Sequence, residues 1–428
     1  MAMLEGRREF LKRAGAAALL AMTRAAKGDQ PVASGQPAVR AITRGPKFHW
    51  FGYYDKLQFD PSGRWVLGME VGFEGRSPRP DDAIKVGMVD TQDGDRWVEL
   101  GQTRAWCWQQ GCMLQWRPRR GGAGVDPREA GPAPPSEVLW NDRDADRFVC
   151  HVLDVQSGKR RSVGHPIYTV SPDGRTAVAP DFSRIQDCRP GYGYAGPPDA
   201  HARDLAPEGS GIFRVDLETG KQDLVLPLSE VGRFGGGEVG GVTHWVNHLL
   251  FNPDGTRLVF LHRCLRQGRM VTRMITAAPD GRDLFLLDPS GETSHFIWRD
   301  PRHILAWTRP AGRPPGFYLL QDGTGVAEPV GGGAMTENGH CSYLPGGRWV
   351  LNDTYPRGPE RVQQLYLYEP ATGRKVVLGE FASPRAYAGE WRCDLHPRAS
   401  PDGRGVIIDS AHSGGRQMYL ADIGGIVG

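Results

Sequence analysis

Residues 393–403 read Cys-Asp-Leu-His-Pro-Arg-Ala-Ser-Pro-Asp-Gly, so a candidate pair of metal ligands, Cys393 and His396, stands directly before a Ser-Pro-Asp-Gly turn. His248 and His340 each stand five residues before the proline of a similar turn, as His396 does. Three histidines at one offset from one repeated turn predict a repeat architecture in which equivalent positions converge.

The turn that ends this stretch recurs along the chain, and alternating apolar residues follow each copy. Proline presets φ for the turn, and aspartate and glycine supply the rest of its geometry. A second turn, in which a strand ends in a short polar loop closed by glycine, follows at a distance, as in 153–158 and 215–220. The copies with proline lie at Pro61, Pro172, Pro253, Pro345 and Pro401.

Together the two turns define a four-stranded unit that cannot bury both of its faces alone, so the units must pack side by side. Seven units begin near residues 48, 101, 164, 243, 294, 337 and 391. The sequence therefore predicts an all-β fold, a seven-bladed β-propeller of four-stranded antiparallel blades over residues 45–423. The segment 28–44 precedes it, and its residues 37–43 can supply the outer strand that closes the ring.

The first 27 residues have the pattern of an export signal. Arg7-Arg8-Glu9-Phe10-Leu11-Lys12 resembles a twin-arginine motif, and the apolar run 14–22 that follows is too short to span a bilayer. A basic amphipathic helix is the alternative. We expect residues 1–27 to be a twin-arginine signal and the protein to be periplasmic or secreted.

The formal net charge of +3 arises from this leader. Residues 1–27 carry six Lys or Arg and two Glu, a net of +4, which leaves −1 for the rest of the chain. Such a balance excludes the broad basic surface of a nucleic-acid-binding protein, and no later segment is apolar enough to span a membrane. We expect neither partner, and we expect a monomer. Seven cysteines leave at least one thiol unpaired or bound to a metal.

The histidines predict a metal site at one mouth of the propeller channel. A residue five positions before the turn falls near the start of the innermost strand, so His248, His340 and His396 reach the same height in three blades. Cys393 or Cys341 could add a fourth ligand. A thiolate among the ligands favours zinc, whereas waters and carboxylates favour manganese or another divalent ion. We expect a divalent metal, with zinc favoured; a wet channel lined by ordinary polar residues is the alternative.

These features resemble the seven-bladed propeller polysaccharide lyases, a group that includes oligogalacturonate lyases and ulvan lyases. The segments 338–341 and 393–397 resemble their metal-ligand segments, and 51–56, 108–111 and 140–143 resemble segments near the ulvan-lyase cleft. The resemblance implies β-elimination on an acidic, uronic-acid-containing polysaccharide or oligosaccharide. A cation or arginine neutralises the carboxylate, a base removes the C5 proton, and an acid protonates the departing O4.

The resemblance also implies roles for residues of the third unit. Tyr192 or Tyr194 in its long loop would be the catalytic base or acid, and Arg214 on the next strand would neutralise the carboxylate. The alternatives are aromatic packing for the tyrosines and an ion pair with Asp216 or Glu218 for Arg214.

The second unit departs from the ulvan-lyase pattern, which uses histidines there. This chain has Gln109, Gln110 and Asn141, which can hydrogen-bond a carboxylate but cannot act as general bases. We expect these residues and Arg189 to bind substrate. His244 is the nearest candidate for a catalytic histidine, with a supporting role as the alternative.

Two functions follow from these patterns. The first is an exported polysaccharide lyase with a metal at the channel mouth. The second is a non-catalytic propeller that binds a glycan or a protein partner and retains the metal as a structural element. The absence of histidines from these positions of the second unit favours the second function.

Overall fold

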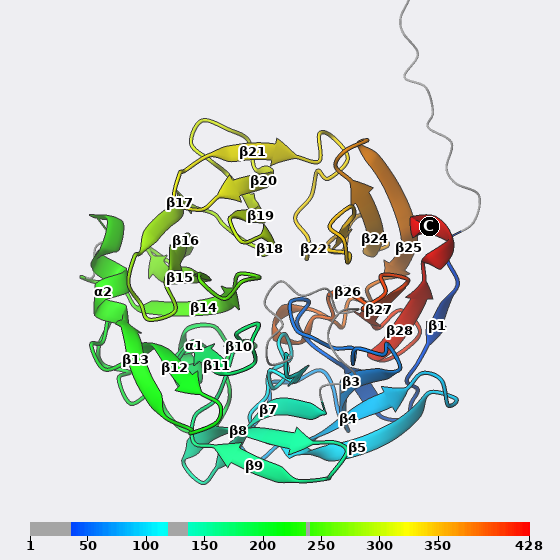
Figure 1. Ribbon diagram of the computed structural model, residues 1–428, viewed down its shortest axis with the longest axis horizontal. Coiled ribbons are helices and arrows are strands. Elements are labelled where there is room, and N and C mark those ends of the chain that lie inside the picture. The colour runs from blue at the N-terminus through cyan, green and yellow to red at the C-terminus, as the bar shows by residue number, and fades with distance from the viewer. Residues whose placement is uncertain (1–35, 119–135, 237–239) are drawn as a thin grey trace, which may run out of the picture. The chain divides into compact units, whose positions relative to one another are not determined.

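The computed structural model describes residues 36–118, 136–236 and 240–428. Within these ranges, seven four-stranded antiparallel sheets surround a common axis (Figure 1), so the predicted seven-bladed propeller is confirmed. The expected export signal, 1–27, lies outside the described residues. Among the residues described, no helix is long and apolar enough to cross a membrane.

Each sheet runs from a first strand at the axis to a fourth strand at the rim. Blade 1 contains β2 (Phe48–Trp50), β3 (Trp65–Val71), β4 (Ile84–Asp90) and β5 (Arg96–Thr103). Blade 2 contains β6 (Gln115–Trp116), β7 (Glu137–Asp144), β8 (Arg147–Asp154) and β9 (Arg160–Val163). Blade 3 contains β10 (Thr169–Val170), β11 (Thr176–Ala179), β12 (Gly211–Asp216) and β13 (Gln222–Pro227). Blade 4 contains β14 (His244–Phe251), β15 (Leu258–Arg266), β16 (Arg269–Ala277) and β17 (Phe285–Gly291).

The remaining blades follow the same order around the ring. Blade 5 contains β18 (Phe296–Asp300), β19 (His303–Thr308), β20 (Gly316–Gln321) and β21 (Ala327–Val330). Blade 6 contains β22 (Ser342–Tyr343), β23 (Val350–Asp353), β24 (Val362–Glu369) and β25 (Arg374–Ala382). Blade 7 contains β26 (Arg398–Ala399), β27 (Gly405–Ser410), β28 (Gln417–Asp422) and β1 (Val39–Ala41).

The last blade takes its outermost strand from the beginning of the described chain. Val39 pairs with Ala421 and Ala41 with Tyr419, so β1 lies antiparallel to β28. This is the position expected for residues 37–43. Pairing the two ends of the propeller within one sheet ties the first blade to the last and closes the ring.

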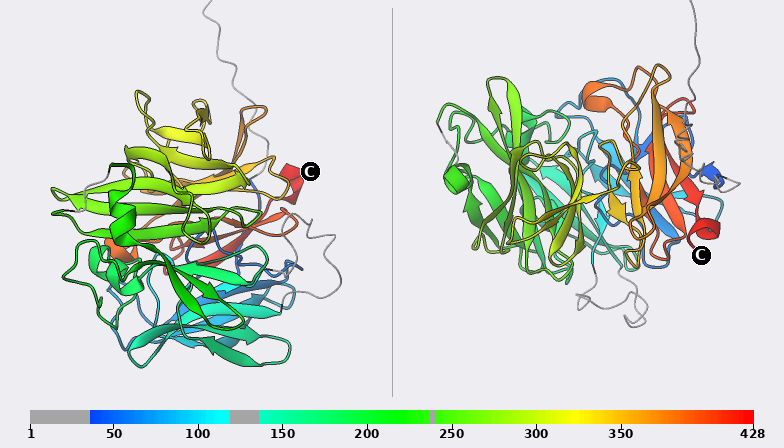
Figure 2. Two further views of the ribbon diagram at one scale, coloured as in Figure 1. Left: turned by 60° about the vertical axis from the view of Figure 1, so that its left-hand side comes forward. Right: turned by 90° about the horizontal axis from the view of Figure 1, so that it is seen from above.

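The sheets stand side by side around the axis, as the side views in Figure 2 show. Apolar side chains that alternate along the strands fill the space between neighbouring sheets. Between blades 4 and 5, for example, Leu261 and Met274 pack with Phe296 and Trp298. The interior therefore consists of layers between blades, which leaves the polar ends of the innermost strands to meet at the axis.

The described chain has few helices, and they lie in the connections. The long segment after β11 begins with α1 (Phe182–Cys188), whose first turn is capped by the side chain of Asp181. Arg184 is buried in this segment and donates to Asp199 at 2.8 Å and to the carbonyl oxygen of His244 at 2.6 Å. The others are α2 (Leu228–Arg233), η1 (Phe234–Gly236), η2 (Gly389–Trp391) and α3 (Gly424–Val427).

Candidate functional site

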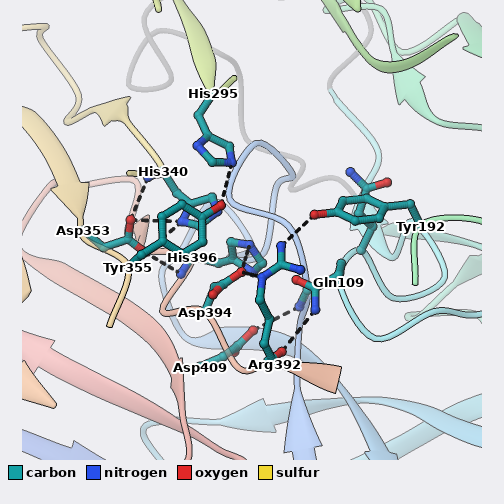
Figure 3. Close-up of polar contacts among 12 residues, drawn as sticks. Gln109, Tyr192, His295, His340, Asp353, Tyr355, Arg392, Asp394, His396 and Asp409 are labelled. Atoms are coloured by element: carbon teal, nitrogen blue, oxygen red, sulfur yellow. Dashed lines mark hydrogen bonds and ion pairs between the residues drawn. The ribbon is translucent and has the colours of Figure 1, made fainter. Parts of the chain in front are cut away.

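Four buried histidines from four consecutive blades, His248, His295, His340 and His396, gather at the axis. Figure 3 shows the last three of them. The ring centroids of His340 and His396 lie 4.2 Å apart, and those of His295 and His340 lie 4.1 Å apart. The ring of Tyr53 lies between His248, at 4.9 Å, and His396, at 5.2 Å. The three histidines that the sequence singled out therefore do converge, as the repeated offset predicted.

His248 and His396 share an unusual backbone conformation. Their φ angles are +53° and +43°, in the left-handed region that residues other than glycine seldom adopt. Such strain persists only where the surroundings fix it, and it gathers at functional sites. His396 turns the chain just before β26, whereas His248 lies within β14, where the register with β15 shifts between Asn247 and Leu250.

Asp353 at the end of β23 orients two of these histidines. Its carboxylate accepts from the backbone N–H of His340 at 2.6 Å and of His396 at 3.2 Å, and it lies 3.0 Å from Nδ1 of His340. Gly339 permits this approach, because a Cβ there would lie 1.9 Å from the carbonyl oxygen of Asp353. The carboxylate keeps the proton of His340 on Nδ1, which leaves the lone pair on Nε2.

The donor set at the axis fits a metal ion. The Nε2 atoms of His340 and His396 are buried and have no hydrogen-bond partner. These two imidazoles and the carboxylate of Asp394 offer ligand atoms that all lie within 4.8 Å of one another. Burial lowers the pKa of His396, and the nearby His340 and Arg398 lower it further, so its ring is neutral and able to ligate. Two unpartnered nitrogen atoms beside a carboxylate are what a divalent cation would satisfy.

Cys393 and His248, both expected as ligands, lie outside this group among the residues described. Cys393 is buried and burial raises the pKa of its thiol to about 12, which disfavours the thiolate that ligates zinc. Asp394, the next residue in the chain, takes the place expected for the thiol. The preference for zinc is therefore not supported, because it depended on a cysteine ligand; nitrogen and carboxylate ligands suit manganese and related ions.

The sequence did not single out His295, which completes the ring of histidines. It stands six residues before Pro301, one more than the other three histidines stand before their prolines. The register between β18 and β19 shifts between Trp298 and Asp300, and this irregularity accounts for the extra residue. A search that tolerated one inserted residue before the turn would have found it. Its Nδ1 lies 3.0 Å from the side-chain oxygen of Asn338.

Tyr192 lies at the edge of the histidine cluster between two arginines. Its hydroxyl accepts from Nη2 of Arg392 at 2.7 Å, and the guanidinium of Arg189 lies over its ring at 4.1 Å. Burial alone would raise the pKa of Tyr192, but the charges of Arg392 and Arg189 outweigh burial and lower it below its ordinary value. Arg392 also donates to Asp394 at 2.7 Å, so it connects the tyrosine to the candidate metal ligands.

Gln109 holds the two segments that carry this pair. Its side-chain nitrogen donates to the carbonyl oxygens of Glu390 at 2.8 Å and Arg392 at 3.1 Å, and its backbone N–H donates to the carbonyl oxygen of Gly191 at 3.2 Å. A Cβ on Gly191 would lie 2.9 Å from the side chain of Glu390, so the close approach of these loops requires glycine there. Gln109 therefore positions Tyr192 and Arg392 rather than facing a ligand directly.

Gln110 lies beside His248 in the interior of the ring. Its side-chain nitrogen donates to the hydroxyl of Tyr168 at 2.7 Å and lies 3.3 Å from Nδ1 of His248. Burial, followed by the charges of Arg189 and Lys56, lowers the pKa of His248, so this imidazole is neutral. Of the residues that we expected to bind substrate, Gln110 and the half-buried Arg189 lie nearest the histidine cluster.

Tyr194 and Asn141 take part in packing and do not lie at the histidine cluster. Tyr194 is fully buried and its ring stacks on Phe182 at 4.2 Å. Its hydroxyl accepts from Asn141 at 3.0 Å, and Asn141 also exchanges two hydrogen bonds with the backbone of Ile167. These contacts join blade 2 to blade 3, so both side chains are used in packing, the alternative foreseen for the tyrosine.

Arg214 and His244 also lie apart from the cluster. Arg214 is on β12, the third strand of its blade, and donates to Asp223 on β13 at 3.3 Å with its side chain 40% exposed. It is a rim ion pair, although with Asp223 rather than Asp216 or Glu218. His244 lies 2.8 Å from His262, which in turn accepts from Arg273 at 3.1 Å. Arg392, which the sequence analysis did not name, lies where Arg214 was expected.

Comparisons with known proteins place the fold. No protein-family model matches the chain. An oligogalacturonate lyase from Vibrio parahaemolyticus is 15% identical with a TM-score of 0.62, over 91% of this chain and 95% of that chain. An oligogalacturonate lyase in complex with manganese gives the same TM-score of 0.62 and 15% identity, over 92% of this chain and 95% of that one. At these identities the likeness shows a shared seven-bladed fold.

One curated protein matches by sequence. The Tol-Pal system protein TolB of Gluconobacter oxydans is 27% identical over 151 residues. The match spans 30% of this chain and 31% of that protein, so this chain matches about a third of the length of its curated relative.

Proposed function

We propose that the protein is an exported polysaccharide lyase that cleaves a uronic-acid-containing oligosaccharide or polysaccharide by β-elimination. The observation that carries this proposal is Tyr192, whose hydroxyl is held by Arg392 and whose ring is covered by Arg189, beside a cluster of metal-ligating side chains. A base of lowered pKa, two cations and a metal centre are the parts that such an elimination needs. The fold shared with oligogalacturonate lyases agrees with it.

His340, His396 and Asp394 would hold a divalent metal, with manganese in the class that these ligands suit. When bound there, the metal would withdraw electrons from the uronate carboxylate and so make the C5 proton more acidic. Arg392 and Arg189 serve the same end from the protein side, because their charges stabilise the negative charge that develops on the carboxylate.

Tyr192 then performs the proton transfer. As the phenolate, its oxygen removes the C5 proton, the electrons of the C5–H bond form the C4–C5 double bond, and the C4–O4 bond breaks. The tyrosine hydroxyl, now neutral, can return its proton to O4 where the two groups share one face of the sugar. A positioned acid or base of this kind contributes about 10²- to 10⁴-fold to the rate.

The test compares two tyrosines of one loop. Metal-loaded protein is incubated with pectate, ulvan, glucuronan and heparinoids, and the unsaturated product is followed by its ultraviolet absorbance. We expect Tyr192→Phe to lose about 10²-fold or more of the rate while keeping its fold and metal. Tyr194→Phe, which removes only a packing hydrogen bond, should remain active. Silence of the metal-loaded wild type on every polymer would sink the lyase proposal.

A non-catalytic glycan-binding propeller is the second candidate. It is favoured by the glutamines that stand where histidines were expected, since the side-chain nitrogens of Gln109 and Gln110 donate to protein atoms. In that case the metal would only brace blades 6 and 7, which carry its ligands. Glycan binding without any product, together with unfolding on metal removal, would support this candidate.

The export signal is tested separately. Replacement of Arg7 and Arg8 by lysine should retain the protein in the cytoplasm, which cell fractionation would detect. Equal export of the double variant would contradict a twin-arginine route.

A further inference from the structure

One face of blade 4 carries three polar side chains with buried nitrogen or oxygen atoms that no described residue satisfies. Trp245 on β14 is the direct partner of Arg263 on β15, and Asn247 follows two residues later on β14, so all three share one face. Leu261 and Met274 continue that face and pack against blade 5. The three polar side chains therefore lie above the apolar layer between blades 4 and 5.

All three side chains are buried. Arg263 is 4% exposed, and its Nε and Nη1 atoms have no hydrogen-bond partner. Trp245 is 1% exposed with an unpartnered Nε1, and neither side-chain atom of Asn247, which is fully buried, has a partner. Burying two guanidinium nitrogens without a partner costs free energy, so three side chains with such atoms on one face indicate a missing ligand.

The carboxylates of the neighbouring elements are already engaged. Asp288 on β17 accepts from the hydroxyls of Ser290, Thr293 and Thr308. Glu292 pairs with Arg309 at 3.1 Å. Within the described ranges, no carboxylate lies at ion-pair distance from Arg263, so no described acidic residue compensates its positive charge.

The opposite face of the same strands provides a contrast. There His262 accepts from Arg273, and Arg273 also donates to the carbonyl oxygens of Phe234 at 2.7 Å and Val231 at 2.9 Å. The half-buried cation on that face is thus satisfied by protein atoms. The arginine nitrogens in need of a partner lie on the face that bears Arg263.

We propose that Trp245, Asn247 and Arg263 form a binding site for a small carboxylate. Arg263 supplies the charge, and the indole N–H of Trp245 and the side-chain amide of Asn247 supply neutral donors. Phosphate and sulfate would fit this small set of donors less well, because they carry more oxygen atoms that need partners.

The site adjoins the candidate active site, because Trp245 packs against Tyr192 and Ile185. The carboxylate is then that of a uronate unit bound next to the one that is cleaved, a statement that rests on the proposed function. A free small carboxylate is the other source of the same chemistry. The binding site itself does not depend on the lyase activity.

The experiment uses metal-loaded Tyr192→Phe protein, which retains the site without turnover. Acetate, galacturonate and trigalacturonate are titrated in a low-salt buffer without carboxylates, by calorimetry and by ¹H–¹⁵N spectra of the indole groups. The Trp245 signal is assigned by its absence in Trp245→Phe. We expect this indole signal to move on binding, and Arg263→Met to weaken binding by about tenfold or more. Tighter binding of trigalacturonate than of acetate identifies the sugar as the source, and equal affinity identifies the free carboxylate.

Thermal unfolding distinguishes a ligand-binding role of Arg263 from a purely structural one. Without ligand, Arg263→Met should be at least as stable as its parent, because it removes an unpaired buried charge. With ligand, only the parent should gain stability. Arg273→Met is the matched control, which should lose stability in both buffers and keep the ligand-induced shift.

Two results would overturn the site. One is an unmoved Trp245 signal at saturating concentrations of all three carboxylates, which would leave only ordered water on this face. The other is an equal loss of stability of Arg263→Met with and without ligand. If Arg263→Met fails to fold, Asn247→Leu replaces it in the same titrations. Inactive wild-type protein that still binds carboxylate here would refute the lyase and not this site.

Discussion

Replacing Asp353 by asparagine tests how the protein prepares His340 for a metal. The carboxylate lies 3.0 Å from Nδ1 of His340 through either oxygen and accepts two backbone N–H groups. Asparagine has nearly the same shape but only one acceptor oxygen, and its NH₂ group donates. If the NH₂ group faces Nδ1, the imidazole proton moves to Nε2, which then cannot ligate.

The size of the effect follows from this change of tautomer. Loss of a partner that orients a ligand weakens metal affinity by about 10- to 100-fold, which corresponds to about 1.4–2.7 kcal/mol. At a fixed excess of metal, the metal-dependent gain in unfolding free energy should shrink by the same amount, because that gain is RT ln(1 + [L]/Kd). The apoprotein should also lose about 1–3 kcal/mol, because one buried donor loses its acceptor.

Calorimetric titration of manganese, paired with unfolding in manganese and in chelator, measures both quantities. Asp288→Asn is the matched control, since Asp288 is also buried but accepts from Ser290 and two threonines and contacts no histidine. It should lose stability and keep its metal affinity. Folded Asp353→Asn protein that binds manganese as tightly as the wild type would refute the argument.

Two further predictions concern pH and the rim. Burial lowers the pKa well below its ordinary value at four histidines, His248, His262, His295 and His396. Below about pH 6.5 the unfolded chain binds protons at these histidines that the folded protein does not bind. The unfolding free energy of the metal-free protein should therefore fall by up to about 1.4 kcal/mol per pH unit for each histidine as the pH is lowered. Urea titrations from pH 7 to 5 that give a constant unfolding free energy would contradict this. Arg214→Ala removes an exposed ion pair with Asp223 and should change the unfolding free energy by less than about 1 kcal/mol. The elimination rate should be unaltered, and a large loss of rate would show that Arg214 takes part in the reaction.

The repeated turn determined the fold from sequence alone. A Pro-Asp-Gly turn has local geometry, and a strand follows it whatever the rest of the chain does. The count of seven units, and the convergence of His248, His340 and His396 at the axis, follow from that local repetition. The same reasoning missed His295 because a one-residue irregularity between β18 and β19 changed its offset from the proline of the turn.

Tertiary packing determines the side-chain contacts that the sequence left open. Cys393 and Asp394 are neighbours, and only the bend of the chain at the axis decides that the carboxylate joins the histidines. Tyr192 and Tyr194 are two residues apart, yet one meets Arg392 and the other stacks on Phe182. The partners come from elsewhere in the chain, so their approach depends on the folded backbone.

The stretch 393–403 shows both contributions. Its turn and its histidine could be interpreted locally, because each has a fixed position relative to a strand. Its chemistry could not, because Asp353 lies in another blade, and Arg392, just before the stretch, acts on Tyr192 two hundred residues earlier in the chain. The sequence by itself determined the ring of blades and three of the axial histidines. Only the tertiary structure decided which side chains accompany them, because those contacts join distant segments whose approach is set by the closure of the ring.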